Sequence, residues 1–217
     1  MEFNFAPVIT YFPTLIKGVG ATLLIGLVVA LLSIIGGQIV AVITLYTRKA
    51  VNWPLRFFIW LFMTTPLLLQ LYFLYFGLGQ WVLIPAVAVG VLGLGFHYMA
   101  YNADIFLATI KSVSKGQYEA SRSLGFGHVA TLFHIILPQA FYRAIPQLGN
   151  NMIIMVKDIS VLSAIGIAEL VYLSQYAISV TFRPFEFYIT IAVVYYLINI
   201  LMESGQSWVE RRAAARR

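Results

Sequence analysis

The feature that most constrains this chain is an apolar block over residues 15–45, which contains no charged residue after Lys17. A block of this length exceeds the roughly 20 apolar residues that a helix needs to cross a membrane. Of the 217 residues, 61% are apolar and only 10% are charged, whereas an ordinary soluble domain has about 25% charged residues. This composition excludes a disordered chain, a disulfide-rich secreted scaffold and most soluble enzymes.

Further apolar blocks follow at residues 57–76, 84–110, 144–156 and 185–202. A mixed segment at residues 161–182 is expected to form a partly inserted or outer-surface helix. The sequence therefore predicts an all-α membrane protein with about five transmembrane helices, built as one domain over residues 1–217.

Basic residues are distributed unevenly among the connections between these blocks. If the N-terminus lies outside, eleven of the 14 Lys and Arg residues fall inside, and only Lys17, Lys157 and Arg183 fall outside. Because basic residues accumulate in cytoplasmic loops, we expect the N-terminus outside and the C-terminus in the cytoplasm. The net charge of +6 is thus explained by topology, and no nucleic-acid partner is expected. The inside residues are Arg48, Lys49, Arg56, Lys111, Lys115, Arg122, Arg143, Arg211, Arg212, Arg216 and Arg217.

Small residues interrupt the first apolar block. Two interpretations carry equal weight: the glycines let a neighbouring helix approach closely, or they are simply tolerated on a helix that faces lipid. The residues concerned are Gly18, Gly20, Gly26, Gly36 and Gly37.

Polar and acidic side chains inside the apolar blocks are candidates for a substrate path. A charged side chain within a span costs roughly 2.5–3.5 kcal/mol on insertion scales, so it usually faces a cavity or a partner. Asp104, with Asn102 and Tyr101 beside it, and Glu169 are the clearest cases. A carboxylate there could hold an ammonium group of a substrate, or Asp104 could instead pair with Lys111.

A second set of path candidates follows the block at residues 144–156. Lys157, Asp158 and Ser160 stand where backbone groups can be unwound, so they either line the path or pair with one another. Thr65 precedes Pro66 and could expose a carbonyl group to a cavity.

The longest polar stretch lies within the loop at residues 111–143. Residues 117–124 favour a short helix, and Gly125 and Gly127 follow it, where a glycine can adopt the left-handed conformation that ends a helix. Glu119 and Arg122 are three residues apart and could pair on one face. A short charged helix on the cytoplasmic side is a natural docking element, but a solvated loop that only joins two spans would look similar.

The chain offers no recognisable catalytic or metal centre. It has no cysteine, and its three histidines, His97, His128 and His134, fit no metal spacing. No Gly-x-Ser-x-Gly elbow and no Walker A loop occurs. We therefore expect no catalytic residue, no metal and no cofactor in this chain.

The polar stretch resembles the EAA loop of permease subunits of ATP-binding-cassette importers. That pattern is E-A-A, three residues, G, and later I-x-L-P. Here it reads Glu119-Ala120-Ser121, Gly125 and Ile135-Ile136-Leu137-Pro138. The spacing fits throughout, and Ser121 replaces alanine by another small residue.

The resemblance extends over about residues 14–212. Within these permeases the chain resembles the polar amino acid subfamily, whose members transport histidine, arginine, glutamine, glutamate, cystine or opines. The chain departs from that subfamily at Met63-Thr64, Ile159 and Asp104, where Arg-Gly, Thr and Glu are frequent; these departures weaken any inference about the substrate. The matching stretches include TPLLLQ at 65–70, PQLGN at 146–150, KDIS at 157–160, IGIAEL at 165–170 and TFRPF at 181–185.

The resemblance implies a MetI-like permease core of five spans, acting as a dimer with an identical or sister permease in the bacterial inner membrane. It further implies a cytoplasmic ATPase dimer, which binds ATP and Mg²⁺, and an extracytoplasmic binding protein that delivers a polar amino acid. The chain would form the path through the lipid by alternating access and would not itself be an enzyme. The residues expected to couple to the ATPase are Lys115, Gln117, Glu119, Ala120, Ser121, Leu124 and Gly125.

Within that coupling helix, Glu119 is expected to pair with a basic group of the ATPase, while Ala120 and Ser121 allow the helix to enter a groove. Two rival classes remain. A secondary transporter driven by an ion gradient would share the spans and acids but lack the EAA loop. An intramembrane hydrolase would need a nucleophile and a base at a spacing that Ser160 and the histidines do not provide, and a structural scaffold would need no partner ATPase.

Overall fold

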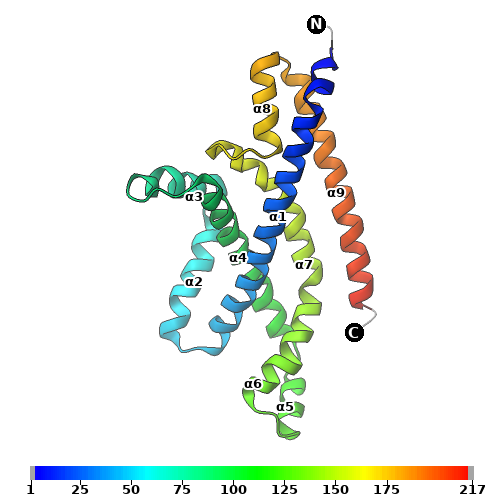
Figure 1. Ribbon diagram of the computed structural model, residues 1–217. Coiled ribbons are helices and arrows are strands. Elements are labelled where there is room, and N and C mark those ends of the chain that lie inside the picture. Colours follow the sequence, from blue (N-terminus) through cyan, green and yellow to red (C-terminus); the bar gives the residue numbers. More distant parts are fainter. Residues whose placement is uncertain (1–2, 215–217) are drawn as a thin grey trace.

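The computed structural model describes residues 3–214, and over that range it consists of helices and the turns that join them. The starts of α1 and α9 lie together at one end of the molecule, and α5 and α6 form the opposite end (Figure 1). In chain order the helices are α1 (Ala6–Tyr46), α2 (Lys49–Thr64), α3 (Leu67–Tyr72), α4 (Ala86–Ser112), α5 (Lys115–Ser123), α6 (His128–Thr131), α7 (Leu137–Asp158), α8 (Leu170–Thr181) and α9 (Pro184–Ala214).

Four segments among the described residues are long and apolar enough to cross a membrane: Ala6–Tyr46, Ala86–Ser112, His128–Ile165 and Pro184–Ala213. The bent pair of α2 and the segment Leu67–Gln80 supplies a fifth if it is counted as one span. The expected all-helical membrane fold is confirmed. Two of the counted inside arginines, Arg216 and Arg217, lie outside the described residues.

The bend between α2 and α3 has a local chemical cause. The structure divides the apolar block at residues 57–76 into two helices that differ in direction by 111°. Thr65 precedes Pro66 and is extended, with φ −106° and ψ 143°, as expected for a residue whose helical conformation clashes with the proline ring. The Thr65 hydroxyl donates to the carbonyl oxygen of Leu61 at 2.7 Å, which satisfies one carbonyl at the end of α2.

Close helix packing explains part of the glycine content of α1. A Cβ atom at Gly37 would lie 2.8 Å from the Cβ of Asn102, and one at Gly18 would lie 2.8 Å from the Cα of Leu170. Real Cβ atoms do not approach other heavy atoms so closely, so α4 and the start of α8 can pack here only against glycine. Gly20, in contrast, has open space around it. Close packing therefore explains the glycines at positions 18 and 37 but not the glycine at position 20.

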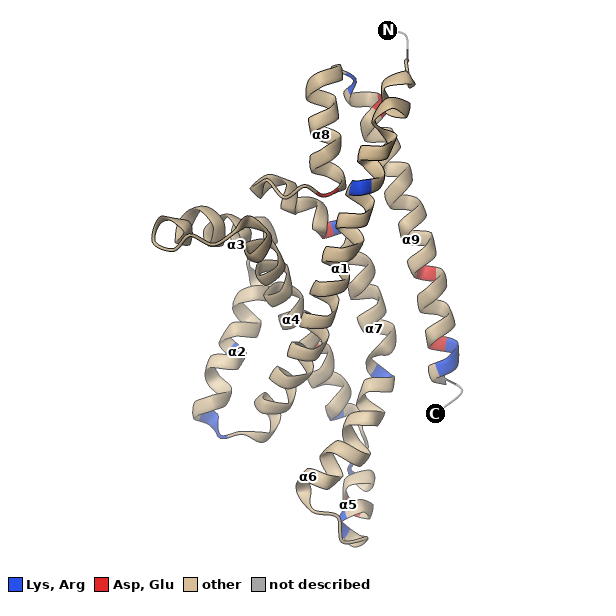
Figure 2. Ribbon diagram, in the orientation of Figure 1, with Lys and Arg blue, Asp and Glu red and all other residues tan. Residues whose placement is uncertain are grey.

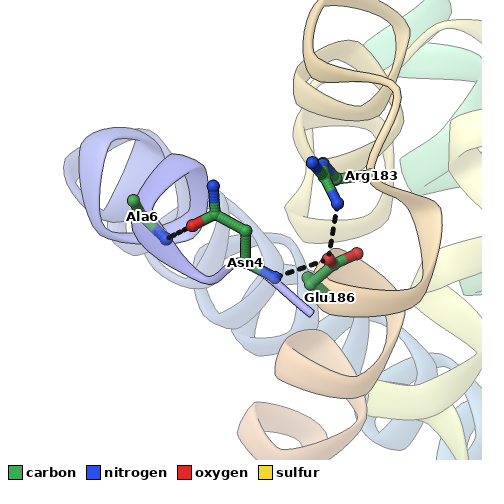
Figure 3. Close-up of polar contacts among 4 residues, drawn as sticks. All are labelled: Asn4, Ala6, Arg183 and Glu186. Atoms are coloured by element: carbon green, nitrogen blue, oxygen red, sulfur yellow. Dashed lines mark hydrogen bonds and ion pairs between the residues drawn. The ribbon is translucent and has the colours of Figure 1, made fainter. Parts of the chain in front are cut away.

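A polar cluster joins the first residues before α1 to the corner between α8 and α9 (Figure 3). The backbone N–H of Asn4 donates to Oε1 of Glu186 at 3.0 Å, and the Arg183 guanidinium lies 3.5 Å from the same oxygen. The side-chain oxygen of Asn4 accepts from the backbone N–H of Ala6 at 3.0 Å, so it satisfies a donor of the first helical turn. This cluster holds the starts of α1 and α9 at the same end of the bundle.

Candidate coupling helix and translocation path

α5 ends in a tight turn built around Gly125, whose φ is +86°. The backbone N–H of Phe126 donates to the carbonyl of Ser121 at 3.1 Å, and that of Gly125 donates to the carbonyl of Arg122 at 3.0 Å. This pair of bonds is a Schellman motif, which favours glycine at the left-handed position. The predicted left-handed conformation is confirmed for Gly125 but not for Gly127, which is extended with φ −69°.

Side chains fix α5 to the following short helix α6. The hydroxyl of Ser121 is buried and lies 2.9 Å from the hydroxyl of Thr131. Tyr118 forms a hydrogen bond with His128 through its hydroxyl group. The small side chain of Ser121 therefore packs within this chain and is not available on the outer face of α5.

The suggested pairing of Glu119 with Arg122 is wrong. Among residues 3–214 no ion pair joins these side chains, because the Arg122 guanidinium donates to the carbonyl of Phe126 at 2.7 Å. Arg122 thereby stabilises the turn that ends α5. Glu119 is left on the exposed surface with its carboxylate available.

The outer face of α5 combines polar and apolar groups at the tip of the molecule (Figure 1). Gln117 accepts a hydrogen bond from Gln139 at 3.3 Å, which links α5 to α7. Leu124 is 78% exposed although it is a large apolar residue. Other expected coupling residues that are exposed are Lys115, Glu119 and Ala120.

Inside the bundle, polar side chains link the bend at Thr65 to α4. The Gln70 amide nitrogen donates to the carbonyl of Thr65 at 3.0 Å and to its hydroxyl at 2.8 Å. The Gln70 amide oxygen lies 3.0 Å from Nδ1 of His97. Neither Gln70 nor His97 was among the expected site residues, although both were visible as polar residues in apolar segments.

The same region of α4 is joined to the end of α7. The Tyr98 hydroxyl donates to Oδ2 of Asp158 at 2.6 Å. The ring of Tyr101 lies 5.1 Å from that of His97 and 6.3 Å from that of Tyr98. Three expected path residues, Thr65, Tyr101 and Asp158, therefore belong to one polar region that crosses α3, α4 and α7.

Asn102 lies in a buried polar contact between three helices. Its amide nitrogen donates to the hydroxyl of Ser33 at 3.1 Å, and its amide oxygen accepts from Asn151 at 3.0 Å. Asn102 is only 3% exposed. It holds α1, α4 and α7 together.

Asp104 is exposed on α4. The alternative that it pairs with Lys111 is wrong within the described part of the chain, where no such ion pair occurs. Since a charged group in a span needs water or a partner, Asp104 stays a candidate for the path.

Glu169 is fully buried and has a structural function. Its two carboxylate oxygens accept from the backbone N–H groups of Val171 at 2.9 Å and Tyr172 at 2.8 Å. It therefore caps the first turn of α8. The Tyr195 hydroxyl lies 3.4 Å from Oε2 of Glu169, so the carboxylate also ties α8 to α9.

Lys157 and Ser160 lie together at a crevice of about 320 Å³ between the end of α7, α8 and α9. Tyr188 and Tyr195 also line it. Lys157 does not pair with its neighbour Asp158, which binds Tyr98 instead. The alternative in which Lys157 and Asp158 pair with each other is wrong for the described residues.

No cluster of three or more His, Asp or Glu residues suited to a metal occurs in residues 3–214.

These features define a helical protein that spans a membrane, with a polar region between its spans and a rigid polar helix at one tip. Comparison with known proteins identifies the family. Residues 33–215 match the family model described as "Binding-protein-dependent transport system inner membrane component". The chain belongs to this family.

Several individual relatives are described as permeases for amino acids. The chain is 33% identical over 216 residues to a probable amino-acid ABC transporter permease, PatM, of Vibrio harveyi, covering 98% of this chain and 97% of the relative. It is 34% identical to a probable glutamine ABC transporter permease, GlnM, of Bacillus subtilis, covering 88% and 89%. The chain is therefore a permease of the amino-acid ABC transporter type.

Solved structures support the same assignment. A crystal structure of an amino acid ABC transporter with histidines superposes with a TM-score of 0.91 at 35% identity, covering 98% of this chain and 100% of that chain. An inward-facing structure of the MetNI methionine ABC transporter gives a TM-score of 0.81 at 17% identity, covering 94% of this chain and 98% of that chain. This second likeness shows the expected MetI-like fold.

Proposed function

We propose that this chain is the membrane-spanning subunit of an ATP-driven importer of a polar amino acid or amino acid derivative. It forms the translocation path by alternating access, and a separate ATPase subunit, which binds ATP and Mg²⁺, docks on α5. The observation that carries this proposal is the geometry of α5, which is a short polar helix clamped to the rest of the chain and exposed at one tip. The amino-acid permeases among its relatives support the substrate class.

The rigidity of α5 is what coupling requires. If α5 moved independently of the spans, closure of an ATPase dimer would displace only the loop and would leave the spans where they are. The Schellman turn at Gly125 and the Ser121–Thr131 contact prevent this. Movement of the ATPase then passes through α6 to α7, and from α7 to the polar region beside Tyr98.

The charge distribution supports a cytoplasmic position for α5. Most Lys and Arg residues lie toward the end of the molecule that contains the start of α2, α5, α6 and the end of α9 (Figure 2). By the positive-inside rule this end faces the cytoplasm of a bacterial inner membrane. The opposite end, with the start of α1, then faces the extracytoplasmic binding protein. A second permease, identical or sister, completes the path.

Co-purification and reconstitution test this function. The tagged chain is expressed with its candidate ATPase and binding protein, and uptake of radiolabelled glutamine, arginine, histidine and cystine into proteoliposomes is measured. We expect an ATPase to co-purify and one or more of these amino acids to accumulate only with ATP. Uptake driven by an ion gradient without ATP, or the absence of a bound ATPase, would overturn the proposal.

A charge reversal tests α5 within the same system. Glu119→Lys should reduce ATPase co-purification and uptake by roughly tenfold or more, because a charge pair at a docked interface is replaced by repulsion. Glu203→Lys is the matched control, since Glu203 is an exposed glutamate on α9, away from α5. Equal uptake by the two variants would show that Glu119 does not belong to the docking surface.

A further inference from the structure

Phe182, in the corner between α8 and α9, has a backbone conformation that aromatic residues rarely adopt. Its φ is 55° and its ψ is 35°, and within residues 3–214 it is the only residue other than glycine with a positive φ. This left-handed conformation brings Cβ close to the following carbonyl oxygen and normally belongs to glycine or asparagine. The Phe182 ring is 83% exposed, so packing within this chain does not offset the cost. Backbone strain of this kind clusters at functional positions.

This corner is held at the tip of the molecule, beside the start of α1 (Figure 1). Glu186 accepts a hydrogen bond from the backbone N–H of Asn4 at 3.0 Å and lies 3.5 Å from the Arg183 guanidinium (Figure 3). The rings of Phe3 and Phe185 lie 4.8 Å apart. The corner is therefore fixed against the residues that precede α1.

The tip projects beyond the membrane. α1 has 41 residues and is about 62 Å long at 1.5 Å per residue, whereas a bilayer with its headgroup regions is about 40–45 Å thick. Arg48, just after α1, marks the cytoplasmic surface by the positive-inside rule. Lys17 is exposed on α1, and the rise from Lys17 to Arg48 is about 46 Å, which matches the full bilayer. The start of α1 and the corner beside it therefore lie in the outer aqueous phase.

Four exposed phenylalanines gather at this tip, two before α1 and two at the corner. They are Phe3, Phe5, Phe182 and Phe185, with exposed fractions between 44% and 83%. Outside the lipid these rings are in water, where a cluster of exposed apolar side chains marks an interaction site. A second permease in the same membrane would pack against the sides of the spans, whereas this corner lies where α8 ends and α9 begins (Figure 1). The position favours a soluble protein on the outer side as the partner.

We propose that Phe182 is the anchor on which the extracytoplasmic binding protein docks, with its ring inserted into an apolar recess of that protein and the other three phenylalanines around it. This inference rests on the proposed function and deepens it, because it assigns the contact with the binding protein to a particular residue. The description of the family as binding-protein-dependent supports the kind of partner. Docking buries a ring that the strained backbone otherwise holds in water.

A glycine at position 182 separates the function of the ring from the stability of the fold. Phe182→Gly removes the ring and relieves the backbone strain, so the thermal midpoint should not fall. The measurement is the affinity of the binding protein for the permease–ATPase complex in nanodiscs, with the binding protein that stimulates ATP hydrolysis by the wild-type complex. We expect Phe182→Gly to weaken this affinity by roughly tenfold or more, as for an aromatic anchor at a protein interface. ATP hydrolysis without the binding protein should be unchanged.

Matched variants isolate the ring. Phe182→Asn introduces a polar residue that tolerates the left-handed conformation, and it should lose affinity to a similar extent. Phe182→Tyr keeps the ring and should retain the affinity. Tyr196→Ala is the control, because Tyr196 is a 65% exposed aromatic residue of α9 that lies about 18 Å along the helix from Pro184. This variant should bind as the wild type does.

Three results would overturn the inference. The first is an unchanged affinity in both Phe182→Gly and Phe182→Asn. The second is an equal loss in Tyr196→Ala, because the effect would then not be specific to the tip. The third is separation of the two permeases in Phe182→Gly, measured as a lower mass of the complex, since Phe182 would then contact the second permease. In each case the wild-type complex is still stimulated, whereas failure of the proposed function would show as no ATP-dependent uptake by the wild type.

Discussion

At the scale of single residues, Glu169 illustrates how this bundle retains a carboxylate away from water. A buried carboxylate is tolerated when hydrogen bonds satisfy its oxygens. Glu169 receives two backbone N–H groups at the start of α8 and the hydroxyl of Tyr195. These contacts explain how Glu169 is accommodated in the interior, and they give it a capping role at the start of α8.

Removing this carboxylate should destabilise the protein. Glu169→Ala leaves two buried N–H groups unsatisfied and is expected to cost about 2 kcal/mol or more. The measurement is the midpoint of thermal unfolding in detergent. Glu203→Ala is the control, because Glu203 is exposed on α9. If both variants unfold at the same temperature, the capping function is incorrect.

At the scale of elements, the contact between α1 and α4 depends on the absence of a side chain at Gly37. Gly37→Val would place methyl groups where the Cβ atom alone already lies 2.8 Å from Asn102 and 2.9 Å from the backbone nitrogen of Ala103. Overpacking of this kind costs roughly 1–3 kcal/mol. We expect a lower thermal midpoint for Gly37→Val.

The matched substitution is Gly20→Val in the same helix. Gly20 has nothing within 4 Å of a Cβ position, so this variant should unfold close to the wild-type temperature. Equal destabilisation of both variants would show that helix propensity, and not contact with α4, explains the effect.

The turn after α5 provides a second test at this scale. Gly125 and Gly127 both have open space around a Cβ atom, but only Gly125 has a left-handed backbone. Gly125→Ala should therefore cost roughly 1–2 kcal/mol locally, while Gly127→Ala should be nearly neutral. Hydrogen exchange of the α5 amides measures the difference, and faster exchange in Gly127→Ala than in Gly125→Ala would contradict it.

Periodicity and composition were sufficient for the spans and for the turn at Gly125, because both depend on local sequence. The bend at Thr65–Pro66 was visible only as a proline, since its angle depends on the tertiary contacts of Gln70 and α4. The contacts of Asn102 and Ser121, and the contact of Glu169 with Tyr195, could not be predicted either. Each joins residues on different helices or turns, and no local pattern encodes which helix face meets which neighbour.

At the scale of the whole molecule, the distribution of charge predicts the orientation in the membrane. Nine of the described basic residues and the exposed tip of α5 would share the cytoplasmic side only if the start of α1 faces outward. The clamp between Asn4 and Glu186 places the α8–α9 corner at that outer end. The two ends of the molecule are thus chemically distinct, and their positions can be tested separately.

Single cysteines provide this test because the natural chain contains none. Ser179 is an exposed residue of α8 near the outer end. Ser179→Cys should therefore react with a membrane-impermeant maleimide in spheroplasts. Ser123→Cys, exposed on α5, should react only after permeabilisation. Both substitutions exchange small exposed side chains, so expression should be similar, and equal labelling of both after permeabilisation controls for reactivity. Labelling of Ser123→Cys in intact spheroplasts, with Ser179→Cys protected, would invert the orientation and place α5 on the side where no ATP is available.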